Sequence, residues 1–180
     1  LNSALLEEPE VIILWLDQLL LIKINITSVS IEINKLMLME ENKMTNEKLG
    51  LVVSDYNADI KHLISKIAQE HAEFLGAKVT KLIRVPGAFD MALAVNGLVK
   101  KKDIDGVVCL GAVIEGDTKH DEIVAHNAAR KITDISVASG KPVSLGISGP
   151  GMTRADGIKR IESYAKRSVE TALKMIRRLK

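Results

Sequence analysis

The 180-residue chain carries 25 Lys and Arg against 23 Asp and Glu, a formal net charge of +2. This balance argues against electrostatic binding to nucleic acid or to a membrane surface. The length favours one domain with a substantial core. A single cysteine, Cys109, excludes an internal disulfide and fits a reducing, cytoplasmic setting.

Residues 1–47 differ from the rest in being rich in Leu, Ile, Asn, Lys and Glu. Their apolar run at 11–16 is interrupted by Asp17, well short of the roughly 20 apolar residues of a membrane span. The acidic start does not match the basic start of a secretory signal. We therefore expect an N-terminal appendage, disordered or arising from a misassigned start. The functional protein would then begin near Met39 or Met44, with one domain over 48–180.

From Lys48 onward, apolar runs of strand length alternate with stretches of helical length. The expected strands cover residues 49–53, 78–85, 105–115 and 143–147. The expected helices cover residues 58–75, 88–102, 119–139 and about 154 to 180. Gly76 and Gly140 are helix-ending signals. This alternation predicts an α/β fold, a three-layer αβα sandwich around a four-stranded parallel sheet.

The sequence that follows the third expected strand, Gly111–His120, is the most informative stretch of the chain. Thr118 and Asp121 have the spacing of a capping pair, so a helix is expected to open beside His120. Free N–H groups and the positive end of the helix dipole favour an anion at that place. Judged alone, a simple turn before a capped helix explains the same pattern.

Other side chains fall at the same edge of the predicted sheet. Tyr56 follows the first strand, Phe89 and Asp90 follow the second, and Ser148 follows the fourth. Ligands of open parallel sheets collect beyond the carboxyl ends of the strands. Two other patterns carry less weight. Glu122 and His126, four residues apart, are more simply a helix-surface pair than two metal ligands, and residues 146–151 match no nucleotide-binding loop.

Three motifs in fixed order resemble lumazine synthase, the penultimate enzyme of riboflavin synthesis. They are Gly111-x-Val-Ile-x-Gly-x-Thr-x-His120, the upstream Val85-Pro-Gly-Ala-Phe-Asp90, and Gly146-Ile-Ser148 followed by Arg160. Together they span roughly residues 48–180, and the stretch 146–154 looks most like archaeal members of the family.

The resemblance implies a flavodoxin-like fold and a condensation. The amine of 5-amino-6-ribitylaminouracil attacks the ketone of 3,4-dihydroxy-2-butanone 4-phosphate, phosphate is eliminated, and ring closure yields 6,7-dimethyl-8-ribityllumazine. No cofactor or metal is implied. The family forms homopentamers with sites between neighbouring subunits, so Leu145 and Arg160 would come from the adjacent chain. Some members assemble twelve pentamers into a hollow icosahedral shell.

The resemblance also assigns residues to roles. His120 would move protons, as an imidazole titrating near neutrality can. Phosphate would be held by Gly116, Asp117, Thr118 and Arg160, with Arg167 as a possible assistant. The pyrimidine and its ribityl chain would be held by Tyr56, Asn57, Ala88, Phe89, Asp90, Val113, Ile114 and Leu145. From the residues alone, Tyr56 could equally be a surface aromatic and Asn57 a helix cap.

The chain departs from the family at several of these positions. Tyr56 and Leu145 stand where Phe is usual, and Asp90 stands where Glu is usual. Asp156 and Gly157 replace Gln-Ala before Arg160, which leaves Lys159 as an alternative phosphate ligand. Two other functions stay open at this stage: a pentameric riboflavin synthase of the archaeal type, which uses two lumazines, and a shell-forming protein with degraded catalysis.

Overall fold

A computed structural model of the chain describes residues 46–56 and 58–180. Its elements in chain order are β1 (Lys48–Ser54), α2 (Ala58–Phe74), β2 (Lys78–Val85), the 3₁₀ turn η1 (Ala88–Asp90), α3 (Met91–Val99), β3 (Gly106–Gly111), α4 (His120–Ser139), β4 (Val143–Ile147) and α5 (Arg154–Leu179). Nearly all of the expected appendage lies outside the described residues, and so does Asn57. The domain boundary near residue 48 therefore stays a prediction.

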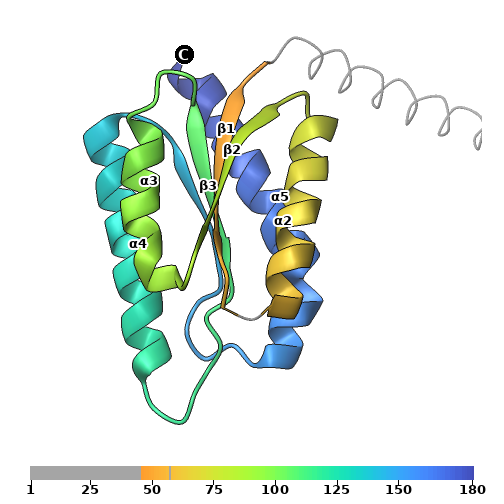
Figure 1. Cartoon of the computed structure of the whole chain (residues 1–180), viewed down its shortest axis with the longest axis vertical. Coiled ribbons are helices and arrows are strands. Elements are labelled where there is room, and N and C mark those ends of the chain that lie inside the picture. Colours follow the sequence, from red (N-terminus) through yellow and green to blue (C-terminus); the bar gives the residue numbers. More distant parts are fainter. Residues whose placement is uncertain (1–45, 57) are drawn as a thin grey trace, which may run out of the picture. The chain divides into compact units, whose positions relative to one another are not determined.

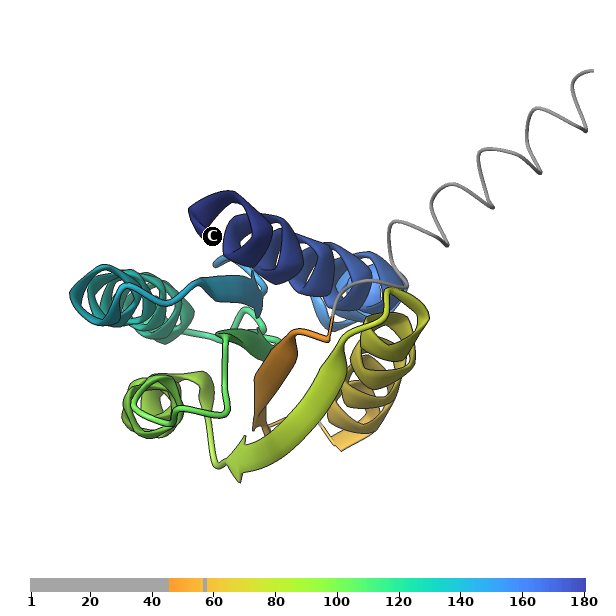
Figure 2. The same cartoon turned by 90° about the horizontal axis from the view of Figure 1, so that it is seen from above.

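The four strands form one parallel sheet in the order β2-β1-β3-β4. Helices α2 and α5 cover one face of this sheet, and α3 and α4 cover the other (Figures 1 and 2). The predicted three-layer α/β architecture is thus confirmed. Among the described helices, none is long and apolar enough to cross a membrane.

The core consists of two clusters, one on each face of the sheet. Along β1, Leu51 and Val53 pack with the α2/α5 cluster, whereas Val52 packs with the α3/α4 cluster. β3 alternates in the same way, because successive strand side chains point to opposite faces. A strand buried on both faces is apolar at every position, and this explains the unbroken run Val107–Leu110.

Several expected boundaries agree with the structure. The second and fourth strands have the predicted bounds, and the first extends one residue beyond the prediction at each end. Gly76 and Gly140 adopt positive φ angles of 80° and 68° after α2 and α4. A residue without Cβ takes up this left-handed conformation at little cost, which is why glycine ends helices.

The expected single helix at 88–102 is wrong at both ends. This segment begins with the short turn η1 and not with an α-helix. There the Asp90 carboxylate accepts a hydrogen bond from the Gly87 N–H at 3.0 Å. Helix α3 ends at Val99, and the Lys101 N–H bonds the Leu98 carbonyl at 3.0 Å. The lysines at 100–102 follow the helix instead of forming its last turn.

The expected strand at 105–115 is also too long. β3 stops at Gly111, where its pairing with β4 ends opposite Ile147. Beyond that point the chain bonds to loops instead of strands, since the Glu115 N–H donates to the Met152 carbonyl at 2.9 Å. The apolar residues after Gly111 belong to the wall of a cavity.

Candidate functional site

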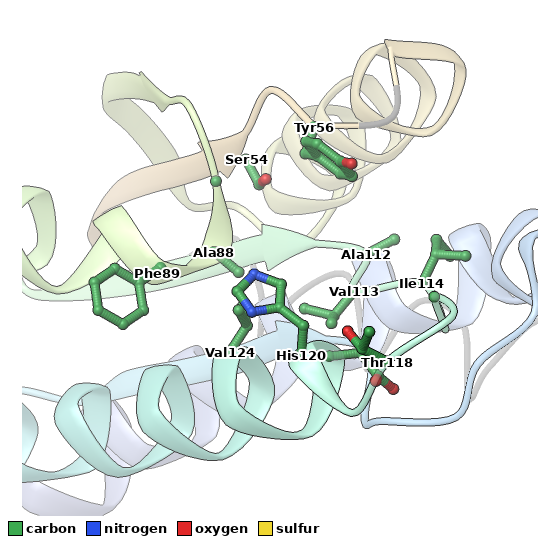
Figure 3. A pocket seen from close by; sticks show the side chains of 13 residues that line it. Ser54, Tyr56, Ala88, Phe89, Ala112, Val113, Ile114, Thr118, His120 and Val124 are labelled. Atoms are coloured by element: carbon green, nitrogen blue, oxygen red, sulfur yellow. The ribbon is translucent and has the colours of Figure 1, made fainter.

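A cavity of about 360 Å³ lies at the carboxyl ends of β1 and β3, between the start of η1 and the start of α4 (Figure 3). It is lined by Ser54, Tyr56, Gly87, Ala88, Phe89, Ala112, Val113, Ile114, Gly116, Thr118, His120, Asp121 and Val124. Eight of the fourteen residues predicted for the site are thereby brought together from three separate parts of the chain.

His120 is the first residue of α4, and its imidazole projects into the cavity toward Ala88 (Figure 3). Gly116 and Thr118 line the cavity just before the helix begins. No side chain caps the helix at Lys119, so the first-turn N–H groups lack that customary partner. Those groups and the positive helix end favour an anion beside the imidazole.

The predicted capping pair of Thr118 and Asp121 is wrong. The buried Asp121 carboxylate accepts a hydrogen bond from the Gly151 N–H at 2.9 Å, across the gap to the loop before α5. This contact ties the first turn of α4 to the loop before α5. Helix α5, by contrast, is capped by a side chain, because Thr153 Oγ1 accepts from the Asp156 N–H at 3.2 Å.

Ser148 fixes the wall of the cavity at Val113. Its hydroxyl accepts a hydrogen bond from the Val113 N–H at 2.7 Å and donates to the Val113 carbonyl at 2.8 Å. Val113 is expected to contact substrate, but its N–H is already bonded within the chain. The carbonyl oxygen keeps a second lone pair that a ligand donor could use.

Two exposed aromatic side chains stand at the cavity. Tyr56 is 70% exposed and Phe89 is 58% exposed, although both are large apolar groups. Figure 3 shows the Tyr56 ring beside Ser54 and the Phe89 ring at the opposite end, past Ala88. Exposed flat rings in a molecule this poor in aromatics suit stacking on a planar ligand.

Six of the predicted site residues do not line this cavity, and three of them line no cavity described here. Asn57 lies outside the described residues. Asp117 is exposed in the loop before α4, and it is not among the lining residues. Asp90 is exposed and does not line the cavity, but its bond to the Gly87 N–H shapes the turn that carries Ala88.

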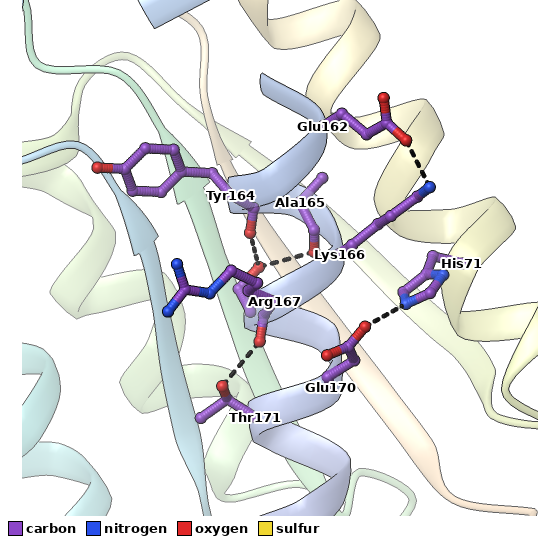
Figure 4. Close-up of polar contacts among 9 residues, drawn as sticks. His71, Glu162, Tyr164, Ala165, Lys166, Arg167, Glu170 and Thr171 are labelled. Atoms are coloured by element: carbon purple, nitrogen blue, oxygen red, sulfur yellow. Dashed lines mark hydrogen bonds and ion pairs between the residues drawn. The ribbon is translucent and has the colours of Figure 1, made fainter. Parts of the chain in front are cut away.

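Leu145, Arg160 and Arg167 line a second cavity of about 290 Å³ between β4 and α5. The remaining lining residues are Ser163, Tyr164, Ser168 and Thr171, so the two cavities share no residue. In Figure 4, Tyr164 and Arg167 project from one side of α5, whereas Glu162, Lys166 and Glu170 project toward α2. Within one chain, Arg160 is thus separate from the cavity of His120.

Sequence reasoning missed Ser54, Asp121 and Val124 as parts of the cavity wall. Ser54 directly precedes the expected loop after the first strand, and Asp121 directly follows His120. Both residues thus adjoin predicted site positions in the sequence. Their place in the cavity wall, however, depends on contacts between residues far apart in the sequence. Among residues 46–56 and 58–180, no group of three or more His, Cys, Asp or Glu is placed to hold a metal ion.

Comparison with known proteins agrees with this geometry. The family model for 6,7-dimethyl-8-ribityllumazine synthase matches residues 46–180. The synthase of Methanocaldococcus jannaschii is 58% identical over 132 residues, 73% of this chain and 93% of that protein. The synthase of Archaeoglobus fulgidus is 55% identical over 137 residues, 76% of this chain and 95% of that protein.

The matched region contains every described element and both cavities, and it covers nearly the full length of each relative. On this evidence the chain belongs to the 6,7-dimethyl-8-ribityllumazine synthase family.

Proposed function

We propose that this chain condenses 5-amino-6-ribitylaminouracil with 3,4-dihydroxy-2-butanone 4-phosphate to form 6,7-dimethyl-8-ribityllumazine, in the penultimate step of riboflavin biosynthesis. The observation that carries the proposal is the single cavity that joins His120 and Thr118 to Tyr56, in a chain of this family. The balanced reaction releases inorganic phosphate and two water molecules.

The phosphate of the second substrate would bind at the start of α4. Gly116, Asp117 and Thr118 offer backbone N–H groups there, and the Thr118 hydroxyl adds a donor. Asp117 would contribute only its N–H, because its carboxylate repels phosphate. His120 adjoins this place, so its imidazole could pass protons during imine formation and phosphate elimination.

The pyrimidine would stack on Tyr56 and lie along the apolar wall formed by Ala88, Val113 and Ile114. Asn57 and Phe89 would contribute at its edges. The Asp90 carboxylate would meet the ribityl chain directly or through water, while it keeps its bond to Gly87.

The active assembly would be a homopentamer in which the second cavity of one copy completes the first cavity of its neighbour. Leu145 would then close the pyrimidine pocket, and Arg160, assisted by Arg167, would bind phosphate through its planar charged fork. The separation of Arg160 from His120 within one chain supports this arrangement. Association of twelve pentamers into a shell is a further step of the same proposal.

Mixing two variants of low activity tests both the reaction and the sharing of sites. Each of His120→Ala and Arg160→Ala would be purified, unfolded, refolded together in equal amounts, and assayed for lumazine fluorescence. Random assembly leaves about one quarter of the interfaces with both residues intact, so activity should return to about that fraction. Sites built within single chains would give no recovery, and a wild-type protein that forms no lumazine would refute the reaction itself.

A further inference from the structure

Ser54 is a buried serine in the wall of the cavity whose hydroxyl has no hydrogen-bond partner among the described residues. The residue ends β1 and is only 1% exposed. Buried hydroxyls in native proteins nearly always have partners, because leaving one unbonded costs about 1–3 kcal/mol. An unbonded hydroxyl at a cavity therefore calls for an explanation.

None of the polar atoms around Ser54 bonds to its hydroxyl. The Val85 carbonyl, opposite Ser54 in the sheet, accepts from the Asp55 N–H at 2.7 Å. On the other side lies Gly111, where an added Cβ would come within 3.0 Å of the Ser54 Cβ. The hydroxyl oxygen has almost no accessible surface, so in its present rotamer no water contacts it either, and it must turn toward the cavity to meet a ligand.

The other buried serines show how unusual this is. Ser65, Ser148 and Ser168 all use their hydroxyls, in bonds of 2.7–3.1 Å to backbone groups. Only Ser54 and Ser144 are unbonded among the buried serines of the described residues, and Ser144 lines neither of the two cavities described above. The hydroxyl that lacks a partner and also faces a ligand cavity is that of Ser54.

We infer that the Ser54 hydroxyl hydrogen-bonds a polar atom of the pyrimidine ring and so helps to select that substrate. This inference rests on the proposed function. Ser54 lies beside Tyr56, across the cavity from Thr118 (Figure 3). A ring stacked on Tyr56 would present its carbonyl or N–H edge there, whereas the phosphate would lie at the start of α4. Rotation about the single side-chain torsion directs the hydroxyl to the ring.

The test compares Ser54→Ala with the matched control Ser144→Ala, each of which removes one buried, unbonded hydroxyl. Loss of a neutral hydrogen bond to substrate should raise the KM for the pyrimidine about fivefold to tenfold in Ser54→Ala. The KM for the phosphate substrate should not change. Ser144→Ala should leave both KM values at the wild-type level.

Thermal unfolding supplies a second measurement that separates a ligand contact from a structural role. Both variants should unfold at a temperature about 2–4 °C above wild type, because each loses an unsatisfied buried group. A lower melting temperature in Ser54→Ala would show that the folded protein already uses the hydroxyl, and would overturn the inference. An unchanged pyrimidine KM, or an equal rise in both KM values, would overturn it as well.

Ser54→Cys keeps the size of the side chain with a weaker donor, and its pyrimidine KM should fall between those of wild type and Ser54→Ala. Binding of 6,7-dimethyl-8-ribityllumazine, followed by fluorescence titration, needs no turnover and should weaken by the same factor as the pyrimidine KM rises. A wild-type protein that binds the lumazine but forms none would refute the proposed reaction while leaving the Ser54 contact measurable. Equal lumazine affinity in wild type and Ser54→Ala would refute the contact alone.

Discussion

Arg160 and His120 are the side chains with most chemistry to contribute, and they stand in different cavities. Amines condense with ketones in water unaided, so much of the advantage should come from holding two substrates in reacting geometry. A permanently charged guanidinium contributes to holding a phosphate throughout the reaction. An imidazole contributes to proton transfers, which water or phosphate can partly take over.

We therefore expect Arg160→Ala to lower kcat/KM for the phosphate substrate by on the order of 30-fold or more, as loss of one partner of a charged contact does. His120→Ala should lower kcat by less than the typical ~10²-fold. Steady-state kinetics of the two variants would check both expectations. If Arg160→Ala resembles wild type, Lys159 or Arg167 becomes the candidate phosphate ligand.

Cys109 is fully buried in the middle of β3, and burial raises the pKa of its thiol far above the ordinary value. Since folding disfavours the thiolate, this residue's contribution to stability is complete below the pKa of the unfolded thiol and is lost as pH rises above it. The thiolate is the reactive form. We expect no alkylation by iodoacetamide near pH 8 until the protein unfolds, as mass spectrometry along a urea titration would show. Rapid labelling of the folded protein would contradict this.

At the scale of elements, strand β4 is closely packed between its neighbour β3 and helix α5. A Cβ added at Gly146 of β4 would lie 2.8 Å from the Cys109 carbonyl, 2.8 Å from Ser168 Oγ and 2.9 Å from Leu110 Cδ2. The β3 backbone on one side and helix α5 on the other could not move far enough to make room for a methyl group. This close packing fixes α5, and with it Arg160, relative to β4.

Gly146→Ala should therefore lower the free energy of unfolding by about 1–3 kcal/mol, the usual cost of overpacking. Gly97→Ala on α3 is the matched control, because an added Cβ there meets no atom within 4 Å. That change should stabilise the protein by about 0.5–1 kcal/mol, the gain of Ala over Gly inside a helix. Urea unfolding of both variants would measure the difference. Equal effects would mean that α5 can shift away from β4.

The bounds of helices and strands could be predicted where a residue that ends an element stands at each end of an apolar run. β2 lies between Gly76 and Pro86, and β4 lies between Gly140 and Ser148, so both strands could be bounded from the sequence. β3 was overextended because apolar residues at a cavity wall resemble those of a strand. The capping prediction failed because Asp121 bonds Gly151, a partner 30 residues away. Ser54 carries no local signal, since a hydroxyl without a partner is visible only in the folded chain.

At the scale of the whole molecule, the family match begins at residue 46, close to the domain start expected from composition. We expect a chain that starts at Met44 to retain the activity of the full chain, since every described element lies beyond that point. It should also assemble more uniformly. Lumazine formation and native mass spectrometry of the two forms would test this. Loss of activity on trimming would show that the removed residues take part in the fold.

If the two cavities of one chain belong to two different shared sites, as proposed, mixtures of intact and defective subunits should behave in a particular way. Suppose that wild type is assembled with a double variant, His120→Ala with Arg160→Ala. Each defective copy would then spoil two sites, one on either side of it. The surviving activity would follow the square of the wild-type fraction instead of the fraction itself, so that half the subunits would supply about a quarter of the activity. The variant would thus have a dominant-negative effect on the wild-type subunits beside it.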